Sequence, residues 1–252
     1  MIDLRDKVVL VTGGSRGIGA ATVRKLVEAG GKAIVHFRSS SSTAEALADD
    51  IGVSNVALVQ GDLASVGETE RVWDEAVAWK GRIDVLVNNA GIYEQVPLDL
   101  PLEDWLEGWE RTMRTNLTAA AQLCRRAIPQ FRSQGGGILI NVSSRAGHRG
   151  DSIDHLQYGA SKAGMLALNR SIARGCAKDN ILSYGVAPGF VLTDMMDGVV
   201  EQQGLDKMAA LYPTGRVTSA DEVASVIVFL ASGVAPQTTG NTIDLSGAAD
   251  VR

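Results

Sequence analysis

Short β-branched apolar runs alternate with helix-like patterns along the whole chain. Runs typical of buried strands cover residues 7–12, 32–37, 55–60, 83–88, 137–143, 181–187 and 241–245. Helical spacing fills most of the intervals, over residues 18–29, 43–50, 66–79, 102–132, 158–178 and 220–231. Such alternation forms right-handed βαβ units, in which helices cover both faces of a parallel sheet. The sequence therefore predicts a doubly wound α/β (Rossmann) fold with seven parallel strands.

The alternation has no interrupting linker, so we expect one domain over residues 1–252. A composition of 45% hydrophobic and 21% charged residues is ordinary for a globular protein of this kind. Residues 190–219 break the rhythm, and a long excursion after a strand is typical of a substrate lid or binding loop. Met195, Met196 and Met208 are candidates for an apolar pocket there, and lid flexibility or a subunit contact is an equally good interpretation.

The net charge and the few cysteines and histidines limit the partners, the cellular compartment and the metal sites that we expect for this protein. The net charge of −5 disfavours nucleic acid as a partner. No apolar run reaches 18 residues, and the charged N-terminal residues do not resemble a signal peptide, so we expect no membrane association. Cys124 and Cys176 lie far apart and are expected to be buried thiols in a reducing cytoplasm. His148 and His155 lack partners at metal-ligand spacing, so no metal site is expected.

A glycine-rich turn, residues 12–19, joins the first strand to the first helix. Glycines permit a tight turn there, and the free N–H groups of a helix N-terminus attract a pyrophosphate. The spacing is G-x3-G-x-G, which differs from the common G-x-G-x-x-G fingerprint. The turn predicts a dinucleotide site, and its candidate cofactor contacts are Gly13, Ser15, Arg16, Gly17, Ile18 and Gly19.

The end of the second strand bears on cofactor choice. NAD sites carry an acid about 20 residues after such a turn, to bind the ribose 2′-hydroxyl. Here the strand ends Phe37-Arg38-Ser39, without an acid. A guanidinium pairs well with a 2′-phosphate, so Arg38, helped by Arg16, favours NADP(H) over NAD(H). The alternative is that both are solvated surface arginines.

Four motifs in order resemble the short-chain dehydrogenase/reductase family: the glycine-rich turn, Asn88-Asn89-Ala90-Gly91, Tyr158-Gly159-Ala160-Ser161-Lys162 and Pro188-Gly189. Within that family the chain is most similar to 3-oxoacyl-(acyl carrier protein) reductases. The resemblance implies an NAD(P)-dependent oxidoreductase that usually forms a homotetramer. It also implies further cofactor contacts at Asp62, Leu63, Asn89, Ala90, Gly91, Tyr158, Lys162, Pro188, Gly189, Val191 and Thr193.

Tyr158 and Lys162 lie one helical turn apart and share a helix face. A lysine ammonium beside a tyrosine favours the phenolate and lowers its pKa, so that the tyrosine can exchange a proton with a carbonyl or an alcohol. Taken alone, the two residues are more often a surface pair. The motif order favours the catalytic interpretation.

Ser143 and Ser144 end a strand whose carboxyl end should meet the same site, where a hydroxyl can bind a developing oxyanion. Resemblance to the family pattern S-x-x-G favours Ser144 as the catalytic serine, although the interval to Tyr158 is one residue longer than usual. The resemblance also implies that Asn116 holds a water in a proton relay to Lys162. An ordinary asparagine inside a helix is the alternative.

The sequence thus favours a cytoplasmic NADPH-dependent carbonyl reductase. Its expected substrate is a small carbonyl or alcohol, free or carrier-bound, such as a 3-oxoacyl thioester. A sugar, polyol or steroid dehydrogenase is the rival enzyme, and a non-catalytic dinucleotide sensor is the rival from another class. Loops 92–101, 148–157 and 190–215 should select the substrate, and Arg145, Arg149 and Arg216 are candidates to meet an anionic one.

Overall fold

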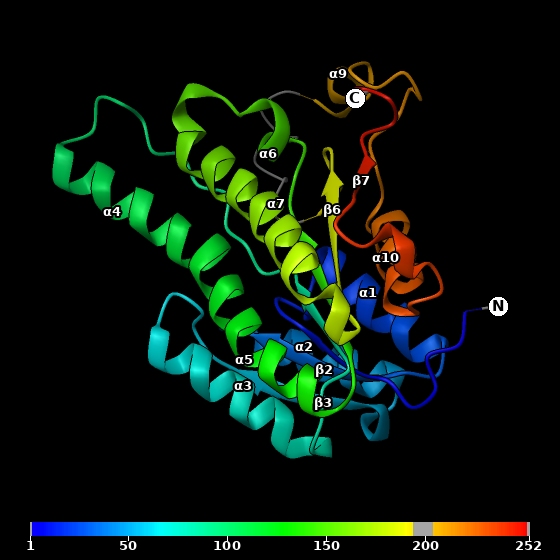
Figure 1. Ribbon diagram of the computed structural model, residues 1–252. Helices are drawn as coiled ribbons and strands as arrows, with labels where there is room; N and C mark the ends of the chain where they lie inside the picture. The colour runs from blue at the N-terminus through cyan, green and yellow to red at the C-terminus, as the bar shows by residue number, and fades with distance from the viewer. Residues whose placement is uncertain (1, 194–203, 251–252) are drawn as a thin grey trace.

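A single seven-stranded sheet runs through the chain (Figure 1). The computed structural model describes residues 2–193 and 204–250. The strands are β1 (Val8–Val11), β2 (Lys32–Phe37), β3 (Val56–Gln60), β4 (Val85–Asn88), β5 (Gly137–Val142), β6 (Ile181–Pro188) and β7 (Thr242–Leu245). Their order is β3-β2-β1-β4-β5-β6-β7, and every neighbouring pair is parallel. The predicted Rossmann architecture is confirmed.

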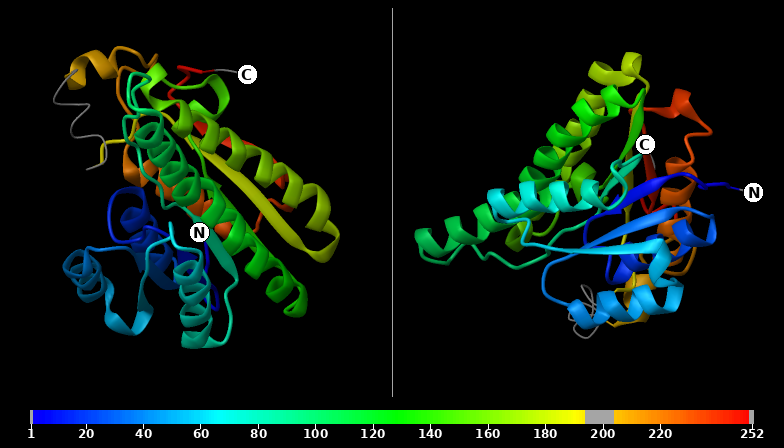
Figure 2. Two further views of the ribbon diagram at one scale, coloured as in Figure 1. Left: turned by 90° about the vertical axis from the view of Figure 1, so that its left-hand side faces the viewer. Right: turned by 90° about the horizontal axis from the view of Figure 1, so that it is seen from below.

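Helices cover both faces of this sheet (Figure 2). One face packs against α1 (Gly17–Glu28), α2 (Ser41–Ile51) and α10 (Ala220–Ala231). The other packs against α3 (Val66–Lys80), α5 (Ala119–Ser133) and α7 (Leu156–Cys176). The remaining α-helices of the described residues are α4 (Leu102–Met113), α6 (Ala146–Arg149) and α9 (Leu205–Ala209).

The inner strands are mostly apolar because both of their faces are buried. Val9 and Val11 of β1 belong to the core under α1 and α10, whereas Val8 and Leu10 belong to the core under α5 and α7. Cys124 and Cys176 are buried free thiols in this second core. No helix in the described part of the chain has the length and apolarity that a membrane crossing requires.

One π-helical turn interrupts the long helix that the sequence predicts over residues 102–132. α4 leads into a π turn at Arg114–Thr118, and α5 follows directly, so the three segments form one long helical rod (Figure 1). A π turn inserts one extra residue into a turn of an α-helix, and such turns often occur at functional sites. Here it contains Asn116, whose side chain is fully buried.

The excursion over residues 190–219 is anchored at both of its ends. Val191 pairs with Thr218 in an isolated parallel bridge. Between them, Met208, Tyr212 and Val217 form a small apolar cluster. Met208 is thus a core residue of the excursion, while Met195 and Met196 lie outside the described residues.

The strand order places β1 between β2 and β4, so the chain leaves β1 in one direction and later returns to its other side. In open α/β sheets, such a switch point opens a crevice beyond the carboxyl ends of the strands. The glycine-rich turn after β1 and the motif at residues 88–91 after β4 both lie at this crevice.

Candidate active site

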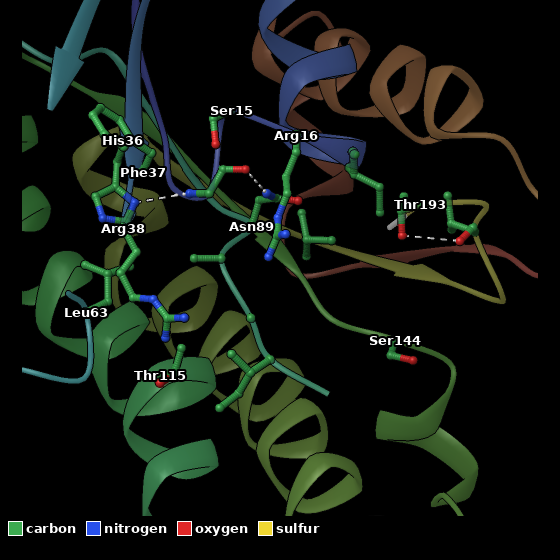
Figure 3. Close-up of a pocket in the computed structure, with 18 of the residues that line it drawn as sticks. Ser15, Arg16, His36, Phe37, Arg38, Leu63, Asn89, Thr115, Ser144 and Thr193 are labelled. Carbon is green, nitrogen blue, oxygen red and sulfur yellow. Dashed lines mark hydrogen bonds between the residues drawn. The ribbon is translucent and has the colours of Figure 1, made fainter. Parts of the chain in front are cut away.

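A cleft of about 340 Å³ lies at this switch point (Figure 3). It brings together nearly all of the residues that the sequence nominates. These are Gly13, Ser15, Arg16, Gly17, Ile18, Arg38, Asp62, Leu63, Asn89, Ala90, Gly91, Ser144, Tyr158, Lys162, Pro188, Gly189, Val191 and Thr193. Gly19 and Asn116 do not line the cleft but lie directly behind it.

Close packing holds the glycine-rich turn in shape. Gly13 has a φ of +61°, a conformation that L side chains rarely adopt. A Cβ atom on Gly19 would lie 2.1 Å from the carbonyl oxygen of Gly13, so helix and turn can meet only at a glycine. Asn89 Nδ2 donates to the carbonyl oxygens of Thr12 and Gly13, at 2.9 and 3.1 Å. Asn89, which the resemblance places near the ribose, therefore also supports the turn.

His36 is a contributor that sequence reasoning missed. Its Nδ1 accepts a hydrogen bond from Gly13 N–H at 3.2 Å, and its Nε2 lies 3.0 Å from Gly61 O. Since Nδ1 accepts, Nε2 carries the hydrogen and donates to Gly61. Burial lowers the pKa of His36 and keeps the ring neutral, as this arrangement requires. In the sequence His36 is simply a polar residue in an apolar strand.

Two guanidinium groups flank the end of the cleft next to β2. Arg16 precedes α1 and Arg38 follows β2, and both side chains extend into the cleft (Figure 3). Among the described residues, neither pairs with a carboxylate. Phe37 is buried at the position where an NAD site carries an acid, and Ser39 and Ser40 add hydroxyls to the same rim.

Tyr158, Lys162 and Ser144 meet at the opposite end. Lys162 Nζ lies 5.8 Å from the ring centroid of Tyr158 and donates to Val142 O at 2.9 Å. The Tyr158 hydroxyl shares a hydrogen bond with the Ser144 side chain. The 14-residue interval therefore does not separate the pair, because the turn, the short helix α6 and the 3-10 turn Ile153–His155 accommodate it.

The pKa of Tyr158 shifts in the direction opposite to the one that the Tyr–Lys spacing predicts. Burial raises it to about 12, and the hydrogen bond from Ser144 offsets only part of that rise. Burial also lowers the pKa of Lys162 to about 8, because the surrounding protein disfavours the ammonium. In the protein alone, Tyr158 is thus a protonated group at neutral pH. A protonated phenol suits donation to a carbonyl.

The two neighbouring serines make different contacts. Ser143 Oγ donates to the backbone carbonyl of Lys162 at 2.7 Å and is buried, so it ties β5 to α7. Ser144 Oγ accepts from Ala146 N–H at 3.1 Å and faces Tyr158. The geometry favours Ser144 as the hydroxyl that meets a substrate.

Asn116 does not line the cleft itself but binds the backbone of Ile92, which does. Its Oδ1 accepts from Ile92 N–H at 2.8 Å, and its Nδ2 donates to Ile92 O at 3.0 Å. An added Cβ on Gly91 would lie 3.4 Å from Asn116 Oδ1 and 3.5 Å from Lys162 Nζ. The π turn therefore places the Asn116 amide on the same side of Gly91 as the Lys162 side chain, which comes from α7.

Other nominated side chains have partners that limit their roles. Arg145 lies over the Phe190 ring, 4.6 Å from its centroid, and 3.9 Å from a carboxylate oxygen of Asp250. Arg216 pairs with Glu222 in the capping box of α10. His148 Nε2 lies 3.4 Å from Asp244.

Other cleft-lining residues were also not nominated from the sequence. They are His36, Ser40, Ile92, Thr115 and Val142, together with Phe37 and Ser39, which were named from the sequence only for the missing acid. Ser143, which was weighed against Ser144 from the sequence, also lines the cleft. Most of these residues are neighbours in the chain of residues that the sequence predicts for the site. They could have been predicted because they lie at the carboxyl ends of strands, where ligands bind in such sheets.

Comparison with known proteins agrees with this geometry. A family model described as short chain dehydrogenase matches residues 7–204. The chain is 35% identical to the 3-oxoacyl-(acyl carrier protein) reductases of Staphylococcus aureus strain Mu50 and Aquifex aeolicus strain VF5. These matches cover 96% and 98% of this chain, and 97% and 98% of the relatives. A solved glucose/ribitol dehydrogenase from Brucella melitensis superimposes with a TM-score of 0.89 at 28% identity, covering 100% of this chain and 99% of that one.

The chain therefore belongs to the short-chain dehydrogenase/reductase family and is an oxidoreductase. A nicotinamide dinucleotide fits the residues present. The N-terminus of α1 offers free N–H groups to a pyrophosphate, and the glycines at positions 13, 17 and 91 leave the floor of the cleft without side chains. Arg16 and Arg38 supply positive charge at one end, and Lys162 supplies it at the other.

Proposed function

We propose that this protein is an NADPH-preferring carbonyl reductase whose substrates are 3-oxoacyl thioesters or similar ketones. The observation that carries the proposal is the layout of one cleft. Ser144, Tyr158 and Lys162 gather at one end, and Arg16 and Arg38, which pair with no carboxylate of the described residues, lie at the other. This layout separates a proton-transfer site from a site suited to a phosphorylated ribose.

The residues would hold the cofactor in three places. Arg38 and Arg16 would bind the 2′-phosphate, and the glycine-rich turn would bind the pyrophosphate. Tyr158 and Lys162 would bind the ribose next to the nicotinamide. When bound, the nicotinamide supplies the hydride for the carbonyl carbon.

The chain's own groups would manage the proton and the developing negative charge. The Ser144 hydroxyl would donate a hydrogen bond to the carbonyl oxygen, which strengthens as that oxygen becomes negative. Tyr158, protonated at neutral pH, would donate its proton to the same oxygen. Lys162, with Asn116 behind Gly91, would stabilise the phenolate that remains and lead a replacement proton towards it.

Relatives at 35% identity over nearly their full length support the thioester substrate. A dehydrogenase of sugars or polyols is the second candidate, supported by the likeness to the Brucella glucose/ribitol dehydrogenase. The sensor alternative is less well supported, because Ser144, Tyr158 and Lys162 are all in place. We place the enzyme in the cytoplasm as part of the same proposal.

A substrate panel tests the proposal directly. Ketones, 3-oxoacyl thioesters, sugars and polyols are offered with each cofactor while the absorbance of the reduced nicotinamide is followed. We expect reduction of 3-oxoacyl thioesters with NADPH. Turnover confined to sugars or polyols would select the second candidate, and tight cofactor binding without turnover of the panel would select the sensor.

Variants of the proton-transfer site complete that test. Tyr158→Phe keeps the ring but removes the proton donor, so kcat should fall by about 10²–10⁴-fold. Ser144→Ala should reduce kcat more than Ser143→Ala does. The matched serine is the control for this comparison, because Ser143 bonds to the backbone of α7. A Tyr158→Phe enzyme with near wild-type kcat would rule out this role for Tyr158.

A further inference from the structure

The aromatic surroundings of Tyr158 come from two loops outside the family motifs. Tyr93 follows β4 by five residues, and its ring meets that of Tyr158 edge-on, with centroids 4.7 Å apart and planes at 82°. Tyr93 also stacks on His155, with centroids 4.0 Å apart and planes at 8°. Tyr93 is thus packed between the proposed proton donor and a second aromatic ring.

Polar contacts hold this stack at its edges. Tyr93 Oη donates to Asp151 Oδ1 at 3.3 Å, and Ser152 N–H donates to the same oxygen at 2.7 Å. Ser152 Oγ lies 2.8 Å from His155 Nδ1. Burial lowers the pKa of His155, so its ring is neutral at neutral pH and stacks without a charge.

Two hydrogen bonds, one from a side chain and one between backbones, also join these segments. Gln157 Nε2 donates to Glu94 O at 2.8 Å, and Val96 N–H donates to Asp154 O at 2.8 Å. The loop after β4 is therefore tied to the segment that leads into α7. Because α7 carries Tyr158, any shift of Tyr93 would be transmitted to the reacting end of the site.

We propose that Tyr93 is a positioning residue, whose ring, stacked on His155, fixes the orientation of Tyr158 and limits the access of water to it. The proposal rests on the function proposed for Tyr158. Tyr93 is not assigned contact with substrate or cofactor, and it does not line the cleft. Its effect would pass through the edge-on ring contact.

The groups that face Tyr158 come from four parts of the fold. Lys162 faces it from α7, Ser144 from the end of β5, and Asp151 from the turn before α7. Tyr93 faces it from the loop after β4, where Asp151 and Arg145 act on Tyr93 in turn. Burial is the largest cause of the raised pKa of Tyr158, and Asp151 adds to it. Opening the ring to water should therefore lower this pKa.

Kinetics of three variants test the proposal. Tyr93→Leu removes the ring, Tyr93→Phe keeps it and loses only the bond to Asp151, and Trp105→Leu disrupts the stacked Trp105–Trp109 pair on α4 as a control. Since a misplaced catalytic group lowers the rate steeply, we expect Tyr93→Leu to reduce kcat by about tenfold or more. We expect little change in KM, and the basic limb of the pH profile should move to lower pH. Tyr93→Phe and Trp105→Leu should stay near wild type.

Fluorine NMR provides a readout that does not need turnover. The protein is labelled with fluorotyrosine, and the Tyr158 resonance is identified by its loss in Tyr158→Phe. We expect Tyr93→Leu to lower the pKa read from this resonance, while Tyr93→Phe and Trp105→Leu leave it unchanged. An unchanged resonance and pKa in a folded Tyr93→Leu protein would overturn the proposal, and so would equal kcat losses in the Leu and Phe variants. If the wild type reduces no ketone, the proposed function fails, while the NMR still decides whether Tyr93 controls Tyr158.

Discussion

Arg38 is the residue on which the proposed preference for NADPH over NADH chiefly depends. It follows the buried Phe37 and extends into the cleft with Arg16, and no described carboxylate neutralises either group. A phosphate between two guanidinium groups gains charge-assisted hydrogen bonds of about 1.5–3 kcal/mol each. A cofactor with only hydroxyls there would leave two like charges without an anion.

We therefore expect NADPH to exceed NADH in kcat/KM by about tenfold or more, a ratio that requires only about 1.4 kcal/mol. Arg38→Asp should reverse this order, because a carboxylate repels the phosphate and accepts hydrogen bonds from ribose hydroxyls. Steady-state kinetics with both cofactors provide the measurement. Lys178→Asp, an exposed change in the turn after α7, is the control for altered charge. Equal use of the two cofactors by the wild type would contradict the prediction.

Lys162 makes stability depend on pH in a defined window. The unfolded lysine keeps its proton up to about pH 10.5, whereas the folded one releases it near pH 8. Between these values the unfolded state binds more protons, so the free energy of unfolding rises with pH. From pH 8 to pH 10 the contribution is about 2 kcal/mol. Denaturant unfolding should show this rise in the wild type and not in Lys162→Met, and Lys178→Met on the surface should retain it. If the free energy of unfolding changed with pH in the same way for the wild type and Lys162→Met, the lowered pKa of Lys162 would be refuted.

At the scale of elements, the connection between β1 and α1 requires helix and turn to approach so closely that only a glycine fits between them. Gly19 lies in the first turns of α1, against the carbonyl of Gly13. The contact fixes the start of the helix relative to the turn. The N–H groups that face the cleft therefore depend on a residue that does not line it.

Gly19→Ala should displace the turn and weaken cofactor binding by about tenfold, with a stability loss of roughly 1–3 kcal/mol from overpacking. Gly67→Ala in α3 is the matched control. Its added Cβ meets nothing within 4 Å, so stability should rise by about 0.5–1 kcal/mol. Calorimetric titration with the cofactor and thermal unfolding measure the two effects. Unchanged affinity in Gly19→Ala would show that the turn adapts.

Much of the fold can be predicted from local sequence patterns. The remaining parts cannot, because they are determined by packing between residues that are distant in the chain. Strand ends and α10 agree with the sequence because apolar runs and the capping box at Ser219 mark them. The π turn at Asn116 leaves no trace in helical periodicity. His36 and Tyr93 carry no motif, since their roles arise from partners distant in the chain. The raised pKa of Tyr158 was missed because spacing reveals Lys162 but not burial.

At the scale of the whole molecule, one sheet spans the described chain, and we propose that it forms a single domain. We propose that the outer face of α7 takes part in assembly. Ala160, Ala163 and Ala167 are exposed on it, whereas Ala173 is buried against the protein's own core. Small exposed side chains allow a second helix to approach closely. This supports the homotetramer that the family resemblance implies.

We expect light scattering at micromolar concentration to give the mass of a tetramer. Ala163→Glu places a charge on the proposed contact and should shift the mass to dimer or monomer. Ser42→Glu adds the same charge to α2 on the other face of the sheet and should leave the mass unchanged. A monomeric wild type would contradict the prediction.

The strand order also determines the sequence in which the strands can pair while the chain is being synthesised. Val9 of β1 pairs with Ala33 on one side and with Val85 on the other. As the chain leaves the ribosome, β2 can therefore dock early, while the other edge of β1 stays unpaired until β4 has emerged. An exposed apolar strand edge is a template for aggregation. Nascent chains that stall between β3 and β4 should therefore expose the free edge of β1 and be prone to aggregate.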